Sequence, residues 1–320
     1  MLGTAKADVT PTPTPDWSGS WPSLAELGLP AFCVAEQQGG FGLRADAATT
    51  SATELGAALH ASPYAALTAA AHALASTTHP DALALLTAVL SGERTCGFAV
   101  SGGGSTAPIV DGADQLDALV IAVPTTGELL AFTDRTGWSV TPDRHGFNTS
   151  RPSGAVHFDE SVALRLEGTA TAVATDLFGL LLAADSLGCV QRTLDRTVEY
   201  AMQRQTFGKA IGGYQAVQHR LVDHSVRARG MAMLVSESAA LLGAGSPDAA
   251  RHVAMAEVSV STGATHILHD LVQLTGGIGF TWEYGLHHYQ RRVHQNDRLA
   301  GNPRAAVRRL SEIEGWANVH

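Results

Sequence analysis

Two stretches in the second half of the chain combine residues that could bind an anion. Residues 204–209 read RQTFGK, and residues 273–280 read QLTGGIGF. Arg204, at the end of an expected helix and followed by glycine, could direct its planar guanidinium at a phosphate oxygen. Gly276 and Gly277 would let a ligand approach the backbone closely. Taken singly, each stretch is better explained as an ordinary helix end, with a glycine cap or a cation near the C-terminus.

Long helices are predicted to carry these stretches. Apolar residues recur at steps of three, four or seven through residues 174–206, which predicts an amphipathic helix of roughly 30 residues. A second helix is expected from about Tyr214 to Gly243. Ser246–Pro247 predicts the N-cap and first position of a third, and two shorter helices follow from about Tyr284. Long helices joined by short glycine turns predict an antiparallel bundle.

The first half of the chain has a different character. Residues 1–20 are rich in Pro, Thr and Gly and predict an irregular arm, whereas the Ala- and Leu-rich residues 21–92 predict an N-terminal helical domain. Short β-prone runs separated by Gly, Pro and Asp predict a small antiparallel β-domain over residues 93–170. The helical bundle occupies residues 171–320. The predicted fold class is α+β, mostly α.

Composition narrows the class of protein. Hydrophobic residues make up 45% of the 320 and charged residues 16%, so the chain can bury a large core. We expect a cytoplasmic protein, because we find neither a signal peptide nor an apolar run that would cross a membrane. The net charge of −9 argues against nucleic acid as a partner. The three cysteines and the paired histidines do not have the spacing of a metal site.

Together the two stretches resemble the acyl-CoA dehydrogenase family. Its pattern is R-x-x-F-G, then F-Q about eight residues after the Phe, and later Q-x-x-G-G-x-G-[FY]. Here these phrases correspond to Arg204–Gly208, Tyr214–Gln215 and Gln273–Phe280. A weaker family phrase is present at Gly39–Gly42, and the resemblance runs from about Pro22 to Leu310. It implies a fold of helices, a small β-domain and a four- or five-helix bundle.

The resemblance implies that FAD lies between two subunits. The residues that would then reach the neighbour's FAD pyrophosphate and adenosine are Arg204, Thr206, Phe207, Gln215, Gln273, Gly276 and Gly277. The family holds the flavin ring with a T-E-P-x-x-G-S-D-like loop and a W-I-T-N-like strand. This chain departs there: residues 98–105 read FAVSGGGS, and we find no equivalent of W-I-T-N before Phe132.

This chain also departs from the family pattern at the catalytic base. The family reaction needs a carboxylate to remove the α-proton while the β-hydrogen leaves as hydride to the flavin. An ungapped count places the two positions at which family members carry this Glu on Ala300 and Phe178, which cannot accept a proton. Asp297 lies one turn before Ala300, and Asp185 lies two turns after Phe178. Either could be a displaced base, although exposed helix aspartates are common.

This chain retains the motifs that would contact a neighbour's FAD, and it lacks the family residues that would hold its own flavin ring and supply the base. In this respect it resembles the smaller, base-less subunits of heterotetrameric (α2β2) acyl-CoA dehydrogenases from bacterial steroid degradation. This resemblance implies a homologous partner subunit that carries the Glu, a bulky acyl-CoA substrate and an electron-transfer flavoprotein as acceptor. One alternative is a self-sufficient flavoenzyme that uses Asp297 or Asp185. A second alternative is a non-enzymatic scaffold or a nucleic-acid-binding relative.

Overall fold

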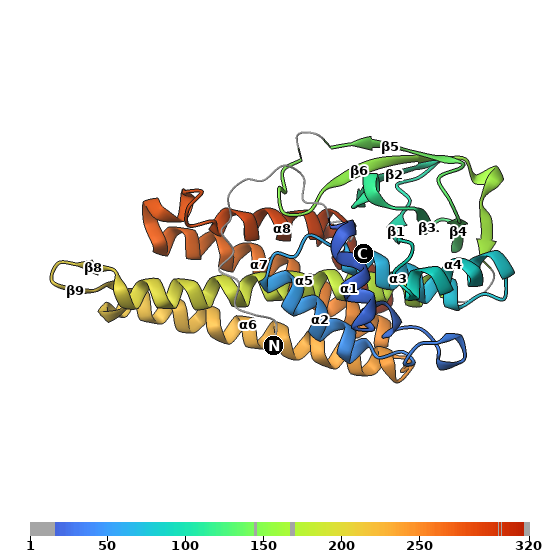
Figure 1. Ribbon diagram of the computed structural model, residues 1–320. Helices are drawn as coiled ribbons and strands as arrows, with labels where there is room; N and C mark the ends of the chain where they lie inside the picture. The colour runs from blue at the N-terminus through green and yellow to red at the C-terminus, as the bar shows by residue number, and fades with distance from the viewer. Residues whose placement is uncertain (1–16, 144–145, 167–169, 300, 302, 317–320) are drawn as a thin grey trace.

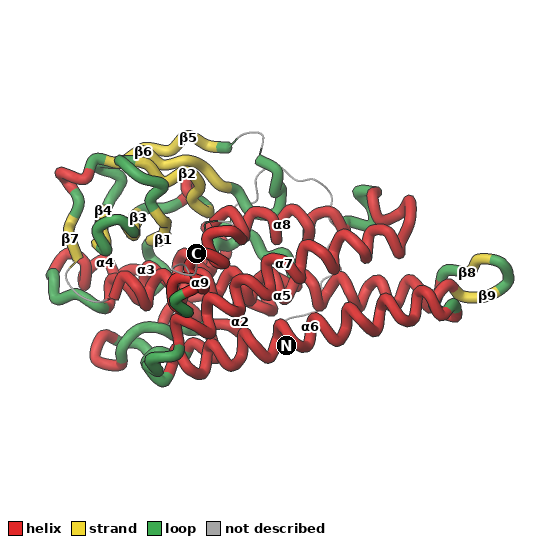
Figure 2. Tube along the Cα trace, turned by 180° about the vertical axis from the view of Figure 1, so that it is seen from behind, coloured by secondary structure: helices red, strands yellow, loops and turns green. Residues whose placement is uncertain are grey.

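Four helices run side by side along the long axis of the molecule, and a β-domain covers one end of them (Figure 1). The computed structural model describes residues 17–143, 146–166, 170–299, 301 and 303–316. Helices α5 (Ala170–Gln203), α6 (Gln215–Gly243), α7 (Ala249–Thr275) and α8 (Leu286–Leu299) form the long axis. The hairpin of β8 (Gln205–Thr206) and β9 (Lys209–Ala210) projects from the end farther from the β-domain (Figures 1 and 2). The predicted fold class, α+β and mostly α, is therefore confirmed.

The N-terminal part of the described chain is helical. Its helices are α1 (Trp21–Glu26), α2 (Ala45–Ala57), α3 (Tyr64–Ala75) and α4 (Pro80–Leu90). Almost every side chain of α3 is buried, because this helix is apolar on all its faces and lies between β1 and α5. Helix α2 packs along α5 at very close range. A Cβ atom on Gly188 of α5 would lie 1.9 Å from the Thr53 carbonyl oxygen, so this crossing requires glycine.

The β-domain consists of two small sheets. Its strands are β1 (Cys96–Val100), β2 (Thr106–Asp111), β3 (Ala118–Val123), β4 (Glu128–Phe132), β5 (Trp138–Pro142), β6 (Ser153–Phe158) and β7 (Leu164–Leu166). The sheets have the orders β1-β3-β4-β7 and β2-β6-β5. The predicted antiparallel pairing holds except for β1 and β3, which are parallel. Between β1 and β3 the chain forms β2, which belongs to the second sheet. The chain then returns to the first sheet, where β3 runs in the same direction as β1.

The C-terminal elements are α5 (Ala170–Gln203), β8 (Gln205–Thr206), β9 (Lys209–Ala210), α6 (Gln215–Gly243), α7 (Ala249–Thr275), the 3-10 helix η7 (Gly276–Phe280), α8 (Leu286–Leu299) and α9 (Pro303–Ile313). The sequence placed the start of α7 too early. Ser246 does not cap this helix: its hydroxyl accepts the Asp248 amide in the preceding turn, and the helix begins at Ala249.

Helix α5 lies at the centre of the bundle. It is long and apolar enough to pass for a membrane span by length and composition, although the sequence suggested no such run. Most of its apolar stretch is buried against α2, α3, α6, α7 and α8. The core helix of a globular protein has the same composition, and this packing explains why α5 is so apolar.

Candidate functional site

The first motif forms a tight hairpin that projects beyond the helices. Strands β8 and β9 pair Gln205 with Ala210 and Thr206 with Lys209. The two turn residues, Phe207 and Gly208, have φ angles of 51° and 83°, as a two-residue hairpin of the primed type requires. A left-handed conformation is common for glycine and rare for phenylalanine. The Phe207 side chain is also 94% exposed, so it contributes little to the packing of its own chain.

Arg204 stands at the base of this hairpin. Its amide donates to Tyr200 in the last turn of α5, at 2.8 Å, and its carbonyl accepts the Ile211 amide at the same distance. The backbone is thus fixed on both sides, while the Arg204 side chain is exposed. Gln215, at the start of α6, is exposed as well, and Thr206 is half-buried. The guanidinium is therefore free to meet a group that arrives from outside the chain.

The second motif ends α7. Gly276 adopts φ 65° and ψ −145°, which only glycine reaches easily, and this breaks the helix. Its amide still donates to the carbonyls of Gln273 and Val272. The side chain of Gln273 and both glycines are exposed. A Cβ atom on Gly276 or Gly277 would meet no atom within 4 Å, so the space beside this backbone is open.

The structure brings the two motifs to the same end of the bundle. The turn before α8 packs on the last turns of α5: the Arg196 guanidinium donates to the Tyr284 carbonyl at 2.6 Å, and the rings of Tyr200 and Tyr284 lie 5.8 Å apart. Both segments lie away from the β-domain (Figures 1 and 2). The two predicted sets of contact residues therefore lie at the same end of the bundle, on segments that contact each other through Arg196, Tyr200 and Tyr284.

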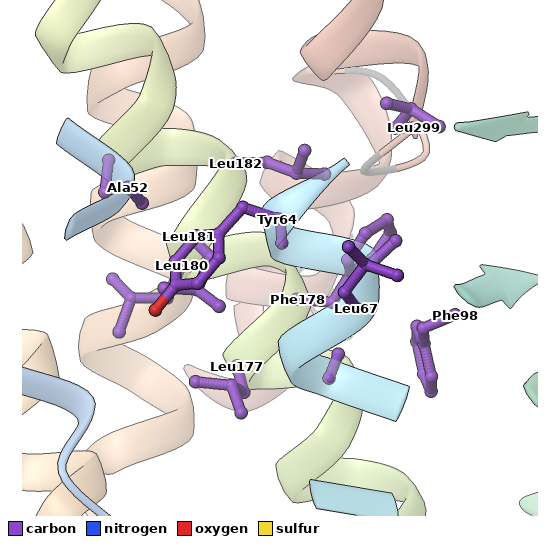
Figure 3. Packing of buried hydrophobic residues seen from close by; sticks show 14 of the residues in the cluster. Ala52, Tyr64, Leu67, Phe98, Leu177, Phe178, Leu180, Leu181, Leu182 and Leu299 are labelled. Atoms are coloured by element: carbon purple, nitrogen blue, oxygen red, sulfur yellow. The ribbon is translucent and has the colours of Figure 1, made fainter. Parts of the chain in front are cut away.

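The family's helical base position is sealed inside the molecule. Phe178 is 2% exposed, and its ring lies 5.3 Å from that of Phe98 on β1. Figure 3 shows Phe178 of α5 next to Leu67 of α3, on the side of the helix that faces Phe98 of the β-domain. Ala300, the second family position, lies outside the described residues. Neither position gives this chain a carboxylate.

Asp185 is buried, which corrects the expectation of an exposed helix aspartate. Its side chain lies 3.2 Å from Arg292 and 3.6 Å from Arg151, and it accepts the Asn296 amide at 2.7 Å. Both arginines come from other elements, Arg292 from α8 and Arg151 from the segment before β6. The Asp185 carboxylate therefore serves as the counter-ion of two buried cations.

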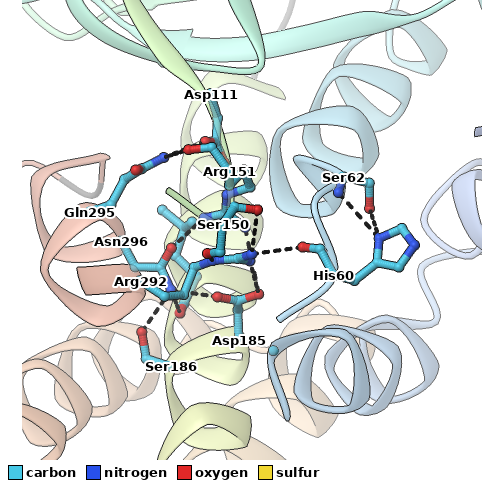
Figure 4. Close-up of polar contacts among 12 residues, drawn as sticks. His60, Ser62, Asp111, Ser150, Arg151, Asp185, Ser186, Arg292, Gln295 and Asn296 are labelled. Atoms are coloured by element: carbon cyan, nitrogen blue, oxygen red, sulfur yellow. Dashed lines mark hydrogen bonds and ion pairs between the residues drawn. The ribbon is translucent and has the colours of Figure 1, made fainter. Parts of the chain in front are cut away.

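A wider polar network surrounds this aspartate and joins the β-domain to the bundle (Figure 4). Asp111, at the end of β2, lies 2.7 Å from Arg151 Nε as an ion pair, and it accepts Gln295 Nε2 at 2.7 Å. Burial raises the pKa of Asp111, whereas the positive charges of Arg151 and Arg292 lower it; the effect of burial is the larger. Arg292 also donates to the His60 carbonyl at 2.8 Å. Two acids and two arginines, all buried, thus balance each other at the junction.

Asp297 differs from Asp185. It is half-buried, and burial raises its pKa to about 7. It lines a cavity of about 20 Å³ together with Gly179, Ser186 and Glu257. Burial also raises the pKa of Glu257 to about 7, and its carboxylate lies 3.7 Å from Arg309 of α9. A pKa near neutrality suits a general base, so Asp297 has the acidity that such a role requires.

The glycine-rich loop of the β-domain is closed on itself. The Ser101 hydroxyl accepts the Gly103 amide at 3.2 Å and lies 3.2 Å from the Gly104 carbonyl, to which it donates. The Gly102 amide donates to the Thr106 carbonyl at 3.0 Å. These contacts form a compact turn in which the Ser101 hydroxyl and the Gly102 and Gly103 amides have partners within the loop.

Sequence reasoning missed the residues that fill the junction. Asp111, Arg151 and Arg292 were not singled out, although each is at most 1% exposed. A signal was available in α8, because Arg292 lies one turn after Tyr289 and beside Val293, on the face that this helix buries. Arg151 lies in a loop without periodicity, so nothing in its surroundings predicted its burial.

Comparisons with known proteins agree with the fold and the motifs. A family model described as the acyl-CoA dehydrogenase C-terminal domain matches residues 174–310. Acyl-CoA dehydrogenase IpdE2 of Mycobacterium tuberculosis is 32% identical over 298 residues, which cover 92% of this chain and 86% of the relative. The protein of the same name from Mycolicibacterium smegmatis is 30% identical, with 91% of this chain and 86% of the relative covered.

Solved structures share the architecture at lower identity. The Tcur3481-Tcur3483 steroid ACAD has a TM-score of 0.84 and 23% identity, with 96% of this chain and 92% of that chain covered. The ChsE4-ChsE5 complex from Mycobacterium tuberculosis has a TM-score of 0.80 at the same identity and coverage. PigA, solved with FAD and proline, has a TM-score of 0.81 at 19% identity, with 93% and 89% covered. This chain belongs to the acyl-CoA dehydrogenase family, whose cofactor is FAD.

Proposed function

We propose that this chain is the base-less subunit of a heteromeric acyl-CoA dehydrogenase, in which a homologous partner supplies the catalytic Glu. One contrast carries the proposal. Most of the residues that would serve a neighbour's FAD are exposed at the free end of the bundle, whereas Phe178, at one of the two family base positions, is packed in the core, and the other base position is an alanine. Such a subunit completes the partner's site instead of forming one of its own.

The exposed end has the chemistry needed to hold the diphosphate and adenosine part of FAD. The Arg204 guanidinium would pair with a phosphate oxygen, and Gln273 can offer its amide as donor or acceptor. Open space beside Gly276 and Gly277 lets a phosphate or ribose approach the backbone. Thr206 and Gln215 flank this region. When bound, the flavin would accept the hydride, and this chain's residues would only bind and orient the cofactor.

The conformation of Phe207 supports a role toward a second chain. A bulky residue at φ 51° is strained, and strain of this kind concentrates at functional sites. Its ring is exposed and gains little from its own fold in return. Contact with a partner, or with the adenosine held between the two chains, would account for both features.

The β-domain of this chain is poorly suited to hold a flavin ring. Its glycine-rich loop uses Ser101 and the neighbouring amides to close the turn. The junction below the sheets contains Asp111, Arg151, Asp185 and Arg292 in a balanced network. Opening that junction would separate buried ion pairs, which is costly because each unpaired charge would lose its counter-ion away from water.

A second candidate function is a self-sufficient dehydrogenase that uses Asp297. The observation in its favour is the pKa of about 7, which suits a general base near neutral pH. The cavity beside it, of about 20 Å³, has room for a water molecule rather than an acyl chain. We therefore favour the base-less role.

The remaining parts of the proposal rest on the relatives. The steroid ACAD and the ChsE4-ChsE5 complex among the similar structures favour a bulky, steroid-derived acyl-CoA and a two-chain assembly. One similar structure is described as an electron-transferring flavoprotein of Acidaminococcus fermentans, which favours such a protein as electron acceptor. A cytoplasmic location, with neither membrane nor nucleic acid as partner, completes the proposal.

Flavin content tests this function. We expect the chain expressed without a partner to carry little FAD and to aggregate, because Phe207, Phe280 and Met202 expose apolar surface at its free end. Co-expression with a homologous subunit that carries the Glu should give a soluble complex with one FAD per pair of unlike chains. Flavin absorbance and size-exclusion chromatography measure both properties. A well-behaved homo-oligomer with stoichiometric FAD would exclude the proposed role.

A further inference from the structure

Arg196 and Tyr284 hold each other by three contacts. The Arg196 Nη2 atom donates to the Tyr284 carbonyl at 2.6 Å, and the guanidinium carbon lies 4.9 Å from the centre of the Tyr284 ring. In return, the Tyr284 hydroxyl donates to the Arg196 carbonyl at 3.4 Å. Arg196 belongs to α5 and Tyr284 to the turn before α8, so these contacts join segments 88 residues apart.

On one side, the pair leads directly to Arg204. The Tyr284 ring packs against that of Tyr200, with 5.8 Å between the centroids. The Tyr200 carbonyl accepts the Arg204 amide at 2.8 Å. Arg204 directly follows the last residue of α5, and Arg196 lies about two turns before it, about 12 Å along the axis. The direction in which α5 presents Arg204 is thus tied to the position of Tyr284.

On the other side, the pair leads to the second motif. The Tyr284 amide donates to the Thr281 hydroxyl at 3.3 Å, and the Thr281 amide donates to the Ile278 carbonyl at 3.0 Å. Ile278 lies within η7, whose first residue, Gly276, still bonds to the Gln273 carbonyl. A continuous chain of hydrogen bonds and short turns therefore runs from Gln273 to Tyr284 and across to α5.

We infer that Arg196 is a positioning residue that sets the distance and orientation between Arg204 and the Gln273–Phe280 segment. The inference rests on the proposed function, because it concerns how this chain presents those residues to the partner's FAD. Two motifs on different helices can bind one diphosphate together only if their separation is fixed, and Arg196 bonds to the carbonyl of Tyr284, four residues after the second segment. Arginine suits this role because its planar group can bond to the carbonyl and lie over the ring together.

The test measures the FAD dissociation constant of the complete heteromer, by flavin fluorescence during titration of the FAD-free complex. Arg196→Met should raise the constant about tenfold. Arg196→Lys should raise it by a similar factor, because an ammonium group is not planar. The matched control is Arg192→Met, an exposed arginine one turn earlier on α5, which should change the constant less than twofold. An unchanged constant in both Arg196 variants would overturn the inference.

A double-variant cycle separates positioning from general stability. Because Arg196 acts through the second segment, combining Arg196→Met with Gln273→Ala should raise the dissociation constant by clearly less than the product of the two single effects. Multiplicative effects would contradict a positioning role. If Arg196→Met does not assemble, Arg196→Lys replaces it in the cycle.

Arg204→Ala distinguishes a failure of the proposed function from a failure of the positioning role of Arg196. An unchanged dissociation constant in that variant would remove the proposed function itself. A weakened Arg204→Ala complex together with unchanged Arg196 variants would remove only the positioning role.

Discussion

Gly277 and Gly279 lie two residues apart in η7 and are surrounded differently. A Cβ atom on Gly277 would meet no atom of this chain within 4 Å, so packing within the chain does not require glycine there. A Cβ atom on Gly279 would lie 2.2 Å from the Thr275 hydroxyl and 3.0 Å from the Val272 carbonyl. The side of Gly277 that a Cβ atom would occupy is therefore open to a group from outside the chain, whereas Gly279 is required by the fold.

This difference gives a matched pair of variants. Gly277→Ala should leave the free energy of unfolding within about 0.5 kcal/mol and weaken FAD binding by the heteromer severalfold. Gly279→Ala should instead destabilise the chain by about 1–3 kcal/mol, because the added methyl group overpacks the end of α7. Chemical denaturation and FAD titration distinguish the two variants. Unaltered FAD binding in Gly277→Ala would show that no ligand approaches this backbone.

At the residue scale, the sequence predicted which residues could bind a ligand better than it predicted which side chains are buried and what they contact. It identified Arg204 and the two glycines, and the structure leaves all of them exposed. It treated Asp185 as an ordinary exposed aspartate, because the partners that bury it, Arg151 and Arg292, come from segments 34 residues before and 107 residues after it. Pairing over such separations leaves no local pattern in the chain.

At the scale of elements, the buried network fixes the β-domain on the bundle. Arg292 on α8 contacts Asp185 on α5, and Arg151 links that aspartate to Asp111 on β2. Burial and the positive charge of Arg151 lower the pKa of Arg292. The carboxylates of Asp185 and Asp111 act in the opposite direction and raise it. A buried pair need not stabilise a protein more than apolar packing does, yet removing one partner leaves the other charge uncompensated.

Arg292→Met should therefore destabilise the chain by about 3–5 kcal/mol, because Asp185 loses its nearer counter-ion inside the protein. The matched control is Arg298→Met, which removes an exposed arginine from the same helix and should change stability by less than about 0.5 kcal/mol. Urea denaturation of the complex, followed by circular dichroism, measures both variants. Equal stability of the two variants would mean that the network does not hold the junction together.

The long helices were predictable, and parts of the β-domain were not. Periodicity over residues 174–206 predicted α5 to within about four residues, because a helix of that length repeats its apolar face many times. The β-prone runs of the sequence correspond to β1, β3, β4 and β6, whereas β2, β5 and β7 were missed. Strands β2 and β5 each contain a proline, Pro108 or Pro142, and β7 has only three residues. The parallel pairing of β1 with β3 depends on where β2 goes, which no local pattern predicts.

At the scale of the whole molecule, apolar side chains gather where both motifs lie. Met202, Phe207, Ile278, Phe280 and Trp282 are each more than 40% exposed. They come from the end of α5, the hairpin and the η7 segment, all at the free end of the bundle. A surface of this kind, which surrounds a guanidinium and an open glycine backbone, is suited to burial against a second subunit and its cofactor.

Turnover of the heteromer with a steroid-derived acyl-CoA shows which of the two chains carries the catalytic base. Three complexes are compared under the same conditions: one with the partner's catalytic Glu changed to Gln, one with Asp297→Asn and one with Asp185→Asn in this chain. The partner's change should cost the 10²- to 10⁴-fold typical of a lost general base. Asp297→Asn, and Asp185→Asn if its complex assembles, should each cost less than about tenfold, roughly 1.4 kcal/mol. If Asp297→Asn slowed turnover as much as the partner's change, with FAD still bound, this chain would have an active site of its own.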